Sequence, residues 1–507
     1  MALDEFDVVV IGAGPAGCVV GRRLADAGLA VGLFEAGPGA KPAGVVSWDA
    51  TQAEQHPEWF WPGLTAQSGA NTKVRYRAGR GVGGGSAVNY MVLSAGDRVD
   101  YRRWDQAWHG GGYEPVAHVV DALVATIEPV AVQYGRLAVA VAEAAGRDGH
   151  KVSPPLPGTV TTAPGAVLGS TSPADPSRRS RTGLGPDALG FVPVLLGGAG
   201  GRRRSAAEIF LADSPRNLVV HPNTEVSEII VSPGRRVRGV VVHGVNGTRE
   251  VKAKTVVLCA GAIHSPRLLV RSGLVPPGLR LAVSDHPSFV FTAELKADGG
   301  RSRSEAQPAV TAMLRWSRSR SSGGPLTALI VDHVAQDGGR ASYGAVIMML
   351  DRPRSVGYVS VDQNARVDIV PGWLSHSADC ADMVAGFRYL AGLLQSDSIV
   401  GDSSPVARLL VDDSGTTLDT LCGWDDDAVA GWLGAHPGPV THLVGSCAGL
   451  IDWPTAQLSG VVGLHIVDGS VLAGVPSGPP QLPIMVMADR VAATLAATLT
   501  GGSRKQD

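Results

Sequence analysis

The sequence predicts an α/β protein of two domains, one built around a parallel sheet and one around an antiparallel sheet with helices. Three observations support this fold class. A β-branched run, a glycine-rich turn and a helix-like stretch open the chain as a βαβ pattern. Further buried-strand patterns follow between residues 217 and 260. From residue 286 to residue 375, apolar and polar residues alternate in several runs, as they do in antiparallel strands.

The βαβ unit occupies residues 7–35. Residues 7–11 form a short apolar run closed by glycines, which is typical of a strand buried on both faces of a parallel sheet. A helix is expected from Ala16 to Gly28, and a second strand from Ala30 to Phe34, ending at Glu35.

Later segments add the remaining elements. Strands are expected at 217–221, 226–231, 238–243 and 255–260 in the first sheet, and at 289–293, 326–331, 345–350 and 357–360 in the second. Helices are expected at 377–396 and 425–435. Residues 154–204 are rich in Gly, Pro, Ser and Arg and are interpreted as loops that form a lid, and the last seven residues should fray.

The composition excludes several classes of protein. With 44% hydrophobic residues, 18% charged residues and a net charge of -2, the 507-residue chain is expected to be globular and lacks the basic field that nucleic-acid binding needs. No apolar run reaches the length of a membrane span, and the acidic N-terminus does not resemble an export signal. The five cysteines lie far apart, so neither a metal site nor disulfides are predicted. We therefore expect a cytoplasmic protein.

A glycine motif near the N-terminus points to a dinucleotide. Gly12, Gly14 and Gly17 fit G-x-G-x-x-G, in which the glycines make the tight turn, admit a pyrophosphate and let the helix approach the strand. Glu35 stands where a strand-end carboxylate can accept hydrogen bonds from ribose hydroxyls. The motif predicts a Rossmann-like domain but does not distinguish NAD from FAD. The alternative is a glycine-rich turn with a surface glutamate.

Three further segments resemble the signatures of the glucose–methanol–choline (GMC) oxidoreductase family. Residues 79–91 with 100–104 are similar to the first signature, residues 260–273 with Asp285-His286-Pro287 to the second, and residues 463–471, which contain Asp468, to a C-terminal strand of the family. The resemblance spans nearly the whole chain and is weakest between residues 110 and 195. It implies FAD rather than NAD.

The resemblance also implies a domain division and a binding site. The expected FAD-binding domain is discontinuous and comprises residues 1–110, 200–285 and 440–507; residues 111–199 form a loop-rich or lid region, and residues 286–439 the substrate-binding domain. Val88 stands where some members carry a histidine joined to the flavin, so non-covalent FAD is implied. The residues expected to bind it are Gly12, Gly14, Gly17, Glu35, Ala36, Arg80, Gly83, Gly84, Ser86, Asn89, Tyr90, Met91, Val226, Ala260, Gly261, Asp468, Gly469, Pro480 and Gln481.

His442 is the expected catalytic base. Flavin-dependent oxidation of an alcohol needs a group that takes the hydroxyl proton while the hydride leaves carbon. His442 occupies the place of the family's active-site histidine, no other histidine has a comparable context, and His442 is expected to act alone. The family's second histidine or asparagine is missing, because an alignment anchored on Asp468 and Arg490 places Pro479 there. Gln481 is the nearest polar side chain and the second catalytic candidate, although an amide does not accept a proton.

The function implied is FAD-dependent oxidation of a CH–OH group of a small molecule to a carbonyl. The sequence looks most like the mycofactocin-associated branch of the family, which implies a dehydrogenase with an electron acceptor other than oxygen, and a natural-product tailoring enzyme fits the same residues. Two alternatives stay open. With Pro479 in the second position, the chain could be a non-redox lyase or cyclase with structural FAD, or a non-catalytic flavin-binding partner.

Overall fold

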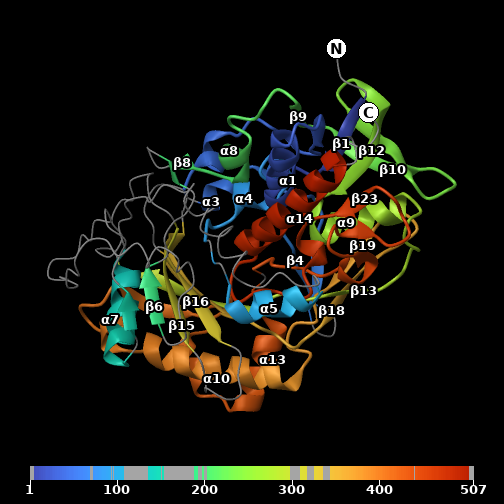
Figure 1. Cartoon of the computed structure of the whole chain (residues 1–507). Helices are drawn as coiled ribbons and strands as arrows, with labels where there is room; N and C mark the ends of the chain where they lie inside the picture. The colour runs from blue at the N-terminus through green and yellow to red at the C-terminus, as the bar shows by residue number, and fades with distance from the viewer. Residues whose placement is uncertain are drawn as a thin grey trace.

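The computed structural model describes residues 5–48, 50–68, 72–92, 94, 96–107, 135–149, 151–153, 188–191, 197–198, 202–296, 309–316, 325–334, 343–438 and 440–501. These residues form three larger sheets, a two-stranded pair and the helices that cover them. One half of the molecule is built around the largest sheet and the other half around a second sheet with its own helices (Figure 1).

The largest sheet has nine strands and contains the predicted βαβ unit. Its parallel core runs in the order β23 (Leu464–Ile466), β12 (Gly247–Leu258), β1 (Glu5–Ile11), β2 (Val31–Phe34) and β9 (Leu218–His221). Antiparallel strands extend it: β11 (Val237–Gly244) and β10 (Glu225–Val231) from β12, and β22 (Gln457–Leu458) and β21 (Ile451–Asp452) from β23. The glycine turn therefore leaves the middle of the parallel core, where open α/β sheets bind ligands.

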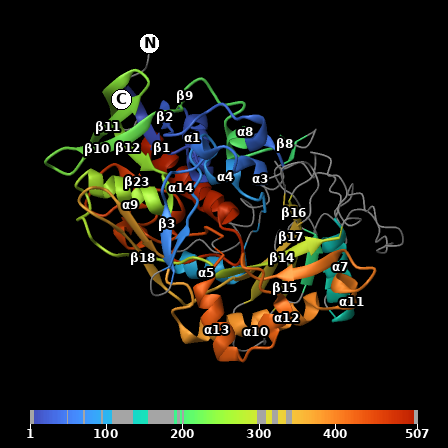
Figure 2. The ribbon, with the colours of Figure 1, turned by 180° about the vertical axis from the view of Figure 1, so that it is seen from behind.

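Two helices from opposite ends of the chain pack together beside this sheet. Helix α1 (Pro15–Asp26) begins with proline, whose missing N–H costs nothing in the first turn, and ends before Gly28, which has a φ of +91°. Helix α14 (Gln481–Gly501) lies along α1 in both views (Figures 1 and 2). Among the described residues α14 is the one helix long and apolar enough to cross a membrane, a test that buried core helices also pass, and more than half of its most apolar window is buried.

The second sheet confirms the predicted fold class. Its seven strands run in the order β20 (Val406–Leu410), β14 (Ser288–Leu295), β17 (Tyr343–Leu350), β16 (Leu326–Val334), β15 (Val310–Trp316), β6 (Ala188–Phe191) and β5 (Lys151–Ser153), and all neighbours except β5 and β6 are antiparallel. Helix α10 (Ser377–Leu394) covers one face with α13 (Asp426–Ala435) beside it (Figure 2). Phe291 of β14 stacks on Phe387 of α10, with ring centroids 5.8 Å apart.

The described parts of residues 111–199 are not the loops that we predicted. They hold α7 (Arg136–Arg147), which packs against β16, and strands β5 and β6, which extend the seven-stranded sheet. The alternation of alanine and valine from 138 to 142 conceals a helix, because alanine fits either a core or a surface position. Residues 154–187, the centre of the predicted lid, lie outside the described residues, as do residues 502–507.

A third sheet corrects the placement of one strand. It runs in the order β13 (Leu281–Val283), β18 (Gly357–Val361), β19 (Val367–Val370), β3 (Thr65–Ser68) and β4 (Thr72–Arg75). The strand at 357–360 belongs here and not to the expected substrate-domain sheet, because alternation reveals a half-buried strand but not its partner. The sheet also joins residues on both sides of the boundary predicted at 286.

Short elements complete the described part. They are α2 (Ala43–Val46), α3 (Ala50–Ala53), α4 (Gly85–Val88), α5 (Arg98–Ala107), β7 (Gly197–Gly198), β8 (Arg202–Arg203), α8 (Ala206–Phe210), α9 (Gly261–Arg271), α11 (Asp397–Val400) and α12 (Leu418–Cys422), with 3-10 turns at Pro57–Trp59, Ala448–Leu450 and Gly469–Val471.

Candidate active site

A cavity of about 680 Å³ opens where the strands of the parallel core end. Residues following four of these strands line it: Gly12 and Gly14 after β1, Glu35 and Ala36 after β2, Ala260 and Gly261 after β12, and Asp468 and Gly469 after β23. The opposite wall comes from β14, β16 and β17 of the seven-stranded sheet. The cavity thus lies between the two large sheets and has the size of a cofactor or ligand site.

The three glycines of the turn differ in the space around them, and only Gly14 has open space beside it. Gly12 has a φ of +97°, and a Cβ there would lie 2.6 Å from the carbonyl oxygen of Cys259. A Cβ on Gly17 would lie 1.9 Å from the carbonyl oxygen of Gly12. A Cβ on Gly14 would meet only the Cα of Gly84, at 4.0 Å, and Gly14 faces the cavity. The absence of a side chain at Gly14, beside the N-terminus of α1, therefore suits a pyrophosphate.

Glu35 ties the loops of this turn together. Its Oε2 accepts a hydrogen bond from the backbone N–H of Ala13, and its Oε1 accepts from those of Gly37 and Gly81, each at 2.9 Å. Burial raises the pKa of Glu35, and these backbone bonds oppose the rise. A carboxylate has about four acceptor sites, so Glu35 keeps capacity for a hydroxyl in the cavity that it lines.

Asp468 plays the corresponding part at the other side of the sheet. Its Oδ2 accepts from the N–H of Gly261 at 2.8 Å and from the hydroxyl of Ser265 at 2.6 Å, and its Oδ1 accepts from the N–H of Ser470 at 2.7 Å. These bonds fasten the start of α9 to the end of β23. Burial raises the pKa of Asp468.

A chain of amides holds Gln481 on the cavity wall. Its Oε1 accepts from Nδ2 of Asn89 at 2.6 Å, and Oδ1 of Asn89 accepts from Arg203 at 2.9 Å and from the N–H of Met91 at 3.1 Å. The carbonyl of the Gln481 amide is therefore engaged by the protein. The catalytic role expected of Gln481 stays a prediction.

The structure places most of the predicted site residues on one surface. The following line the cavity: Gly12, Gly14, Glu35, Ala36, Gly84, Ser86, Asn89, Tyr90, Val226, Ala260, Gly261, His442, Asp468, Gly469, Pro480 and Gln481. Four predicted residues do not line the cavity and lie behind the residues that do: Gly17, Arg80, Gly83 and Met91. Arg80, for example, donates to the carbonyl of Ala36 at 2.8 Å, and Met91 is buried in the core. A family motif contains residues that shape a loop as well as residues that face a ligand.

His442 faces a second histidine that sequence reasoning missed. The Nδ1 atoms of His442 and His286 lie 2.9 Å apart, and the two rings meet edge to face. Backbone hydrogen bonds of 3.0 Å in both directions between Ser284 and Val444 set an antiparallel register that brings residues 286 and 442 opposite each other. The expectation that His442 acts without another histidine stays a prediction, but the structure places His286 within hydrogen-bond distance of it. The Asp285-His286 pair inside the second signature was the available signal.

Asp285 organises the backbone of both histidines. Its Oδ1 accepts from the N–H groups of His286 and His442, both at 2.9 Å, and its Oδ2 accepts from the hydroxyl of Tyr76 at 2.9 Å. Burial raises the pKa of Asp285 to about 7. The preceding Thr441 has a φ of 60°, which β-branched residues rarely adopt and which tends to occur at functional sites.

Both imidazoles are neutral at neutral pH. Burial lowers the pKa of His442 well below its ordinary value, and the neighbouring His286 lowers it further. Burial lowers the pKa of His286 to about 4. A neutral imidazole has the lone pair that a proton acceptor needs.

The wall opposite the glycine turn is aliphatic. Val290, Ile347 and Leu329 lie side by side in register on β14, β17 and β16, and all three line the cavity. Val92 and Pro479 add to the lining. Within the described residues, these three strands present no charged side chain to the cavity.

A Rossmann-like sheet, an open glycine turn at its centre and a half-buried histidine in the same cavity together define a two-domain dinucleotide-binding protein of the oxidoreductase type. The chain belongs to the GMC oxidoreductase family. A family model described as GMC oxidoreductase matches residues 6–287, and a second with the same description matches residues 353–488. FAD is the cofactor typical of this family, and the site at Gly14 fits it.

Relatives extend over nearly the full chain. A 5-(hydroxymethyl)furfural oxidase of Methylovorus sp. is 26% identical over 96% of this chain and 98% of its own length. An alcohol dehydrogenase (acceptor) of Pseudomonas putida is 23% identical over 96% of this chain and 95% of its own length. The crystal structure of a pyridoxine 4-oxidase from Mesorbium loti superposes with a TM-score of 0.75 at 20% identity, covering 96% of this chain and 98% of that one. The solved structure supports the fold, and the curated relatives include alcohol oxidases and dehydrogenases.

Proposed function

We propose that the protein oxidises a CH–OH group to a carbonyl, with His442 as the base and non-covalent FAD as the cofactor. The observation that carries this proposal is a neutral imidazole, His442, on the wall of the cavity that also contains the open glycine turn. When bound, FAD supplies the acceptor for the hydride. His442 receives the hydroxyl proton, which allows the hydride to leave carbon.

The cavity wall supports binding without a covalent bond. Val88 lines the cavity at the position where the family resemblance implies that some members carry a histidine joined to the flavin, and its side chain has no nucleophilic atom. Glu35 would accept hydrogen bonds from the ribose hydroxyls and the start of α1 would hold the pyrophosphate.

The aliphatic wall indicates the class of alcohol. Val290, Ile347 and Leu329 offer neither a hydrogen bond nor a counter-charge, and desolvating a charge against them would be costly. We propose a substrate whose hydroxyl-bearing carbon is attached to an uncharged, apolar body.

We also propose an electron acceptor other than oxygen and a cytoplasmic location. The resemblance to the mycofactocin-associated branch favours a non-oxygen acceptor, whereas the relatives include oxidases as well as dehydrogenases. All five cysteines are free thiols, which supports a reducing cytoplasmic environment. Turnover with a quinone analogue is compared with turnover with oxygen, and we expect the quinone to support the faster turnover. Stoichiometric production of peroxide in air, unaffected by the added quinone, would overturn the proposal of a non-oxygen acceptor.

An anaerobic substrate screen tests the proposal. The purified holoprotein is mixed with matched pairs of alcohols, one apolar and one bearing a carboxylate or ammonium group, and loss of flavin absorbance is followed. Apolar alcohols should bleach the flavin faster than their charged partners. If no alcohol reduces the flavin while a substrate is still converted, the enzyme is a non-redox lyase or cyclase, the possibility that Pro479 keeps open.

A further inference from the structure

We propose that His286 is a positioning residue that fixes the tautomer of His442, so that the lone pair of the base lies on Nε2. The inference rests on the proposed role of His442 as the proton acceptor. Two imidazoles in contact through their Nδ1 atoms must share one hydrogen between them, and the question is which ring carries it.

The surroundings of His286 answer this question. Its Nε2 lies 3.0 Å from the carbonyl oxygen of Asp351 and 2.9 Å from that of Pro476. Carbonyl oxygens only accept hydrogen bonds, so Nε2 of His286 must carry a hydrogen. In a neutral ring the other nitrogen, Nδ1, then has the lone pair.

No charged group near His286 favours a second proton on its ring. The carboxylate of Asp285 is engaged by backbone N–H groups and Tyr76, and that of Asp351 by Arg315 and Thr327. Asp100 accepts from the N–H groups of Asp97 and Ser477. Within the described residues no carboxylate oxygen bonds to the buried His286 ring, whose remaining neighbour is the uncharged His442.

The hydrogen between the rings therefore belongs to His442. Its Nδ1–H donates to Nδ1 of His286, and its Nε2 is left with a lone pair. In the part of the chain that the structure describes, this Nε2 has no hydrogen-bond partner and is not enclosed, and His442 lines the cavity. During the reaction the substrate O–H bond breaks and its proton binds Nε2 of His442; FAD, when bound, would supply the acceptor for the hydride that the carbon loses. The Nδ1 hydrogen bond remains intact throughout.

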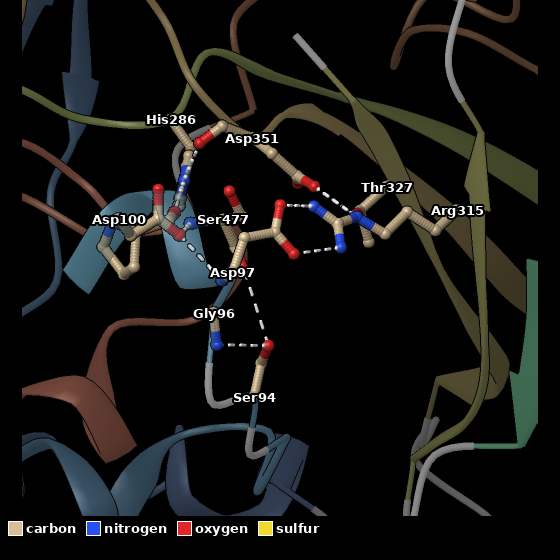
Figure 3. A network of polar contacts seen from close by, with 10 residues as sticks. Ser94, Gly96, Asp97, Asp100, His286, Arg315, Thr327, Asp351 and Ser477 are labelled. Atoms are coloured by element: carbon tan, nitrogen blue, oxygen red, sulfur yellow. Dashed lines mark hydrogen bonds and ion pairs between the residues drawn. The ribbon is translucent and has the colours of Figure 1, made fainter. Parts of the chain in front are cut away.

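The two carbonyl groups are held by a buried network (Figure 3). Arg315 of β15 donates from Nε to the carboxylate of Asp351 at 3.0 Å and binds Asp97 with two further bonds of 2.8 and 2.7 Å. Asp100 accepts from the N–H of Ser477 at 2.8 Å, which fixes the segment that carries the Pro476 carbonyl. His286 is thus positioned by residues of the seven-stranded sheet, of α5 and of the loop before α14.

Nitrogen-15 NMR of histidine-labelled holoprotein tests the tautomer directly. The signals of His442 are assigned by their loss in His442→Gln. We expect Nδ1 of His442 to carry a hydrogen and Nε2 to carry none at neutral pH. A hydrogen on Nε2 of His442 would overturn the proposal, whether or not a substrate is known.

Variants of His286 test the consequence for the reaction. His286→Leu removes the acceptor, and we expect it to slow flavin reduction by about 10–10³-fold with little change in substrate affinity, because a histidine held in the wrong tautomer is a poor base. His286→Asn keeps an acceptor on Cγ, at the place of Nδ1, and should recover most of the rate. His465→Leu removes another buried imidazole, whose Nδ1 is hydrogen-bonded to the backbone carbonyl of Thr455 and which does not line the cavity, and serves as the matched control.

The outcomes separate the two proposals. Unchanged reduction by His286→Leu, or equal loss in His286→Asn and His286→Leu with intact FAD binding, overturns the positioning role. If the tautomer is as expected but His442→Gln reduces flavin at the wild-type rate, His442 is not the base and the proposed function fails while the tautomer assignment stands.

Discussion

Individual glycines in the first turn serve different physical purposes. Gly12 and Gly17 are required because a side chain would collide with backbone carbonyl groups, whereas Gly14 is surrounded by space. The motif already assigned these purposes to the three glycines, and the structure adds the contacts that explain them, because Cys259 and Gly84 pass beside the turn. The separation makes cofactor binding and folding independently testable.

Gly14→Val is expected to give folded protein with little FAD. The Cβ of the valine would meet only the Cα of Gly84, at 4.0 Å, and we expect its methyl groups to occupy the space proposed for the pyrophosphate. The affinity for FAD should fall at least about tenfold, which corresponds to ~1.4 kcal/mol of binding free energy, and the FAD content of the purified protein should fall with it. Absorbance of the purified protein and its thermal unfolding measure the two effects. The control is Gly21→Ala on the same helix, where a Cβ meets Leu218 at an ordinary 3.5 Å; normal FAD content in Gly14→Val would contradict the assignment.

His442→Ala is expected to retain FAD and lose activity. General-base assistance contributes about 10²–10⁴-fold, so anaerobic flavin reduction by a substrate should slow by about that factor. Rapid mixing of the holoprotein with the alcohol found in the screen gives the rate constant. Wild-type kinetics in this variant would show that His442 is structural.

The pH dependence of flavin reduction should be shifted toward acid. The neutral form of His442 is the active one, and the rate falls when the ring is protonated. Because burial lowers the pKa of His442 well below its ordinary value, the rate should stay level as the pH falls through about 6.5 and decline only under more acidic conditions. Rate constants measured from about pH 5 to about pH 9 check this. A decline centred at or above the ordinary histidine value would contradict it.

At the scale of elements, periodicity identified strands but not always their partners. Residues 357–361 form a strand as predicted, yet they pair with β13 and β19 in a sheet that also takes in β3 and β4. Likewise α7 escaped notice because the alternation of alanine and valine resembles a strand, although Leu137, Val141 and Ala144 follow the spacing of one helix face. Such pairings depend on contacts between distant parts of the chain, which a local pattern does not contain.

Arg315 of β15 is expected to contribute strongly to stability. Its side chain is 6% exposed between Asp97 and the fully buried Asp351, so Arg315→Met leaves two carboxylates without their partner. Breaking a buried pair costs about 3–5 kcal/mol. The loss of unfolding free energy should lie toward the lower end of this range. Burial already raises the pKa of Asp351 to about 6, so protonation of this carboxylate would remove part of the cost of leaving it unpaired.

Urea unfolding of the holoprotein measures this effect. The matched control is Arg408→Met on β20, where the arginine is 62% exposed beside Glu294 and an ion pair contributes about 0–1 kcal/mol. Equal shifts of the unfolding midpoint in the two variants would show that the buried Arg315 ion pairs contribute no more to the free energy of unfolding than the exposed pair does.

For the molecule as a whole, the fold class and one side of the site could be predicted from sequence. The glycine turn and Glu35 were located by the spacing of a short motif at strand ends, and Asp468 by its resemblance to a C-terminal strand of the family. The other side could not be predicted, because His286 is 156 residues from His442 and the aliphatic wall is assembled from three strands whose register is set by the folded sheet. For Pro479 the alignment correctly identified a residue of the cavity, but it did not show how a proline at this position affects the reaction.

The strand order also bears on how the protein is synthesised. The glycine turn is translated well before β23, which adds the strand beside β12 and ends at residue 466, and before α14, the neighbour of α1. The strand partners of β1 and β2 are present once residue 258 has been made, but the cavity wall that contains Asp468 and Gln481 is not. A nascent chain that stalls between residues 258 and 466 therefore has a glycine turn but no completed pocket for the cofactor.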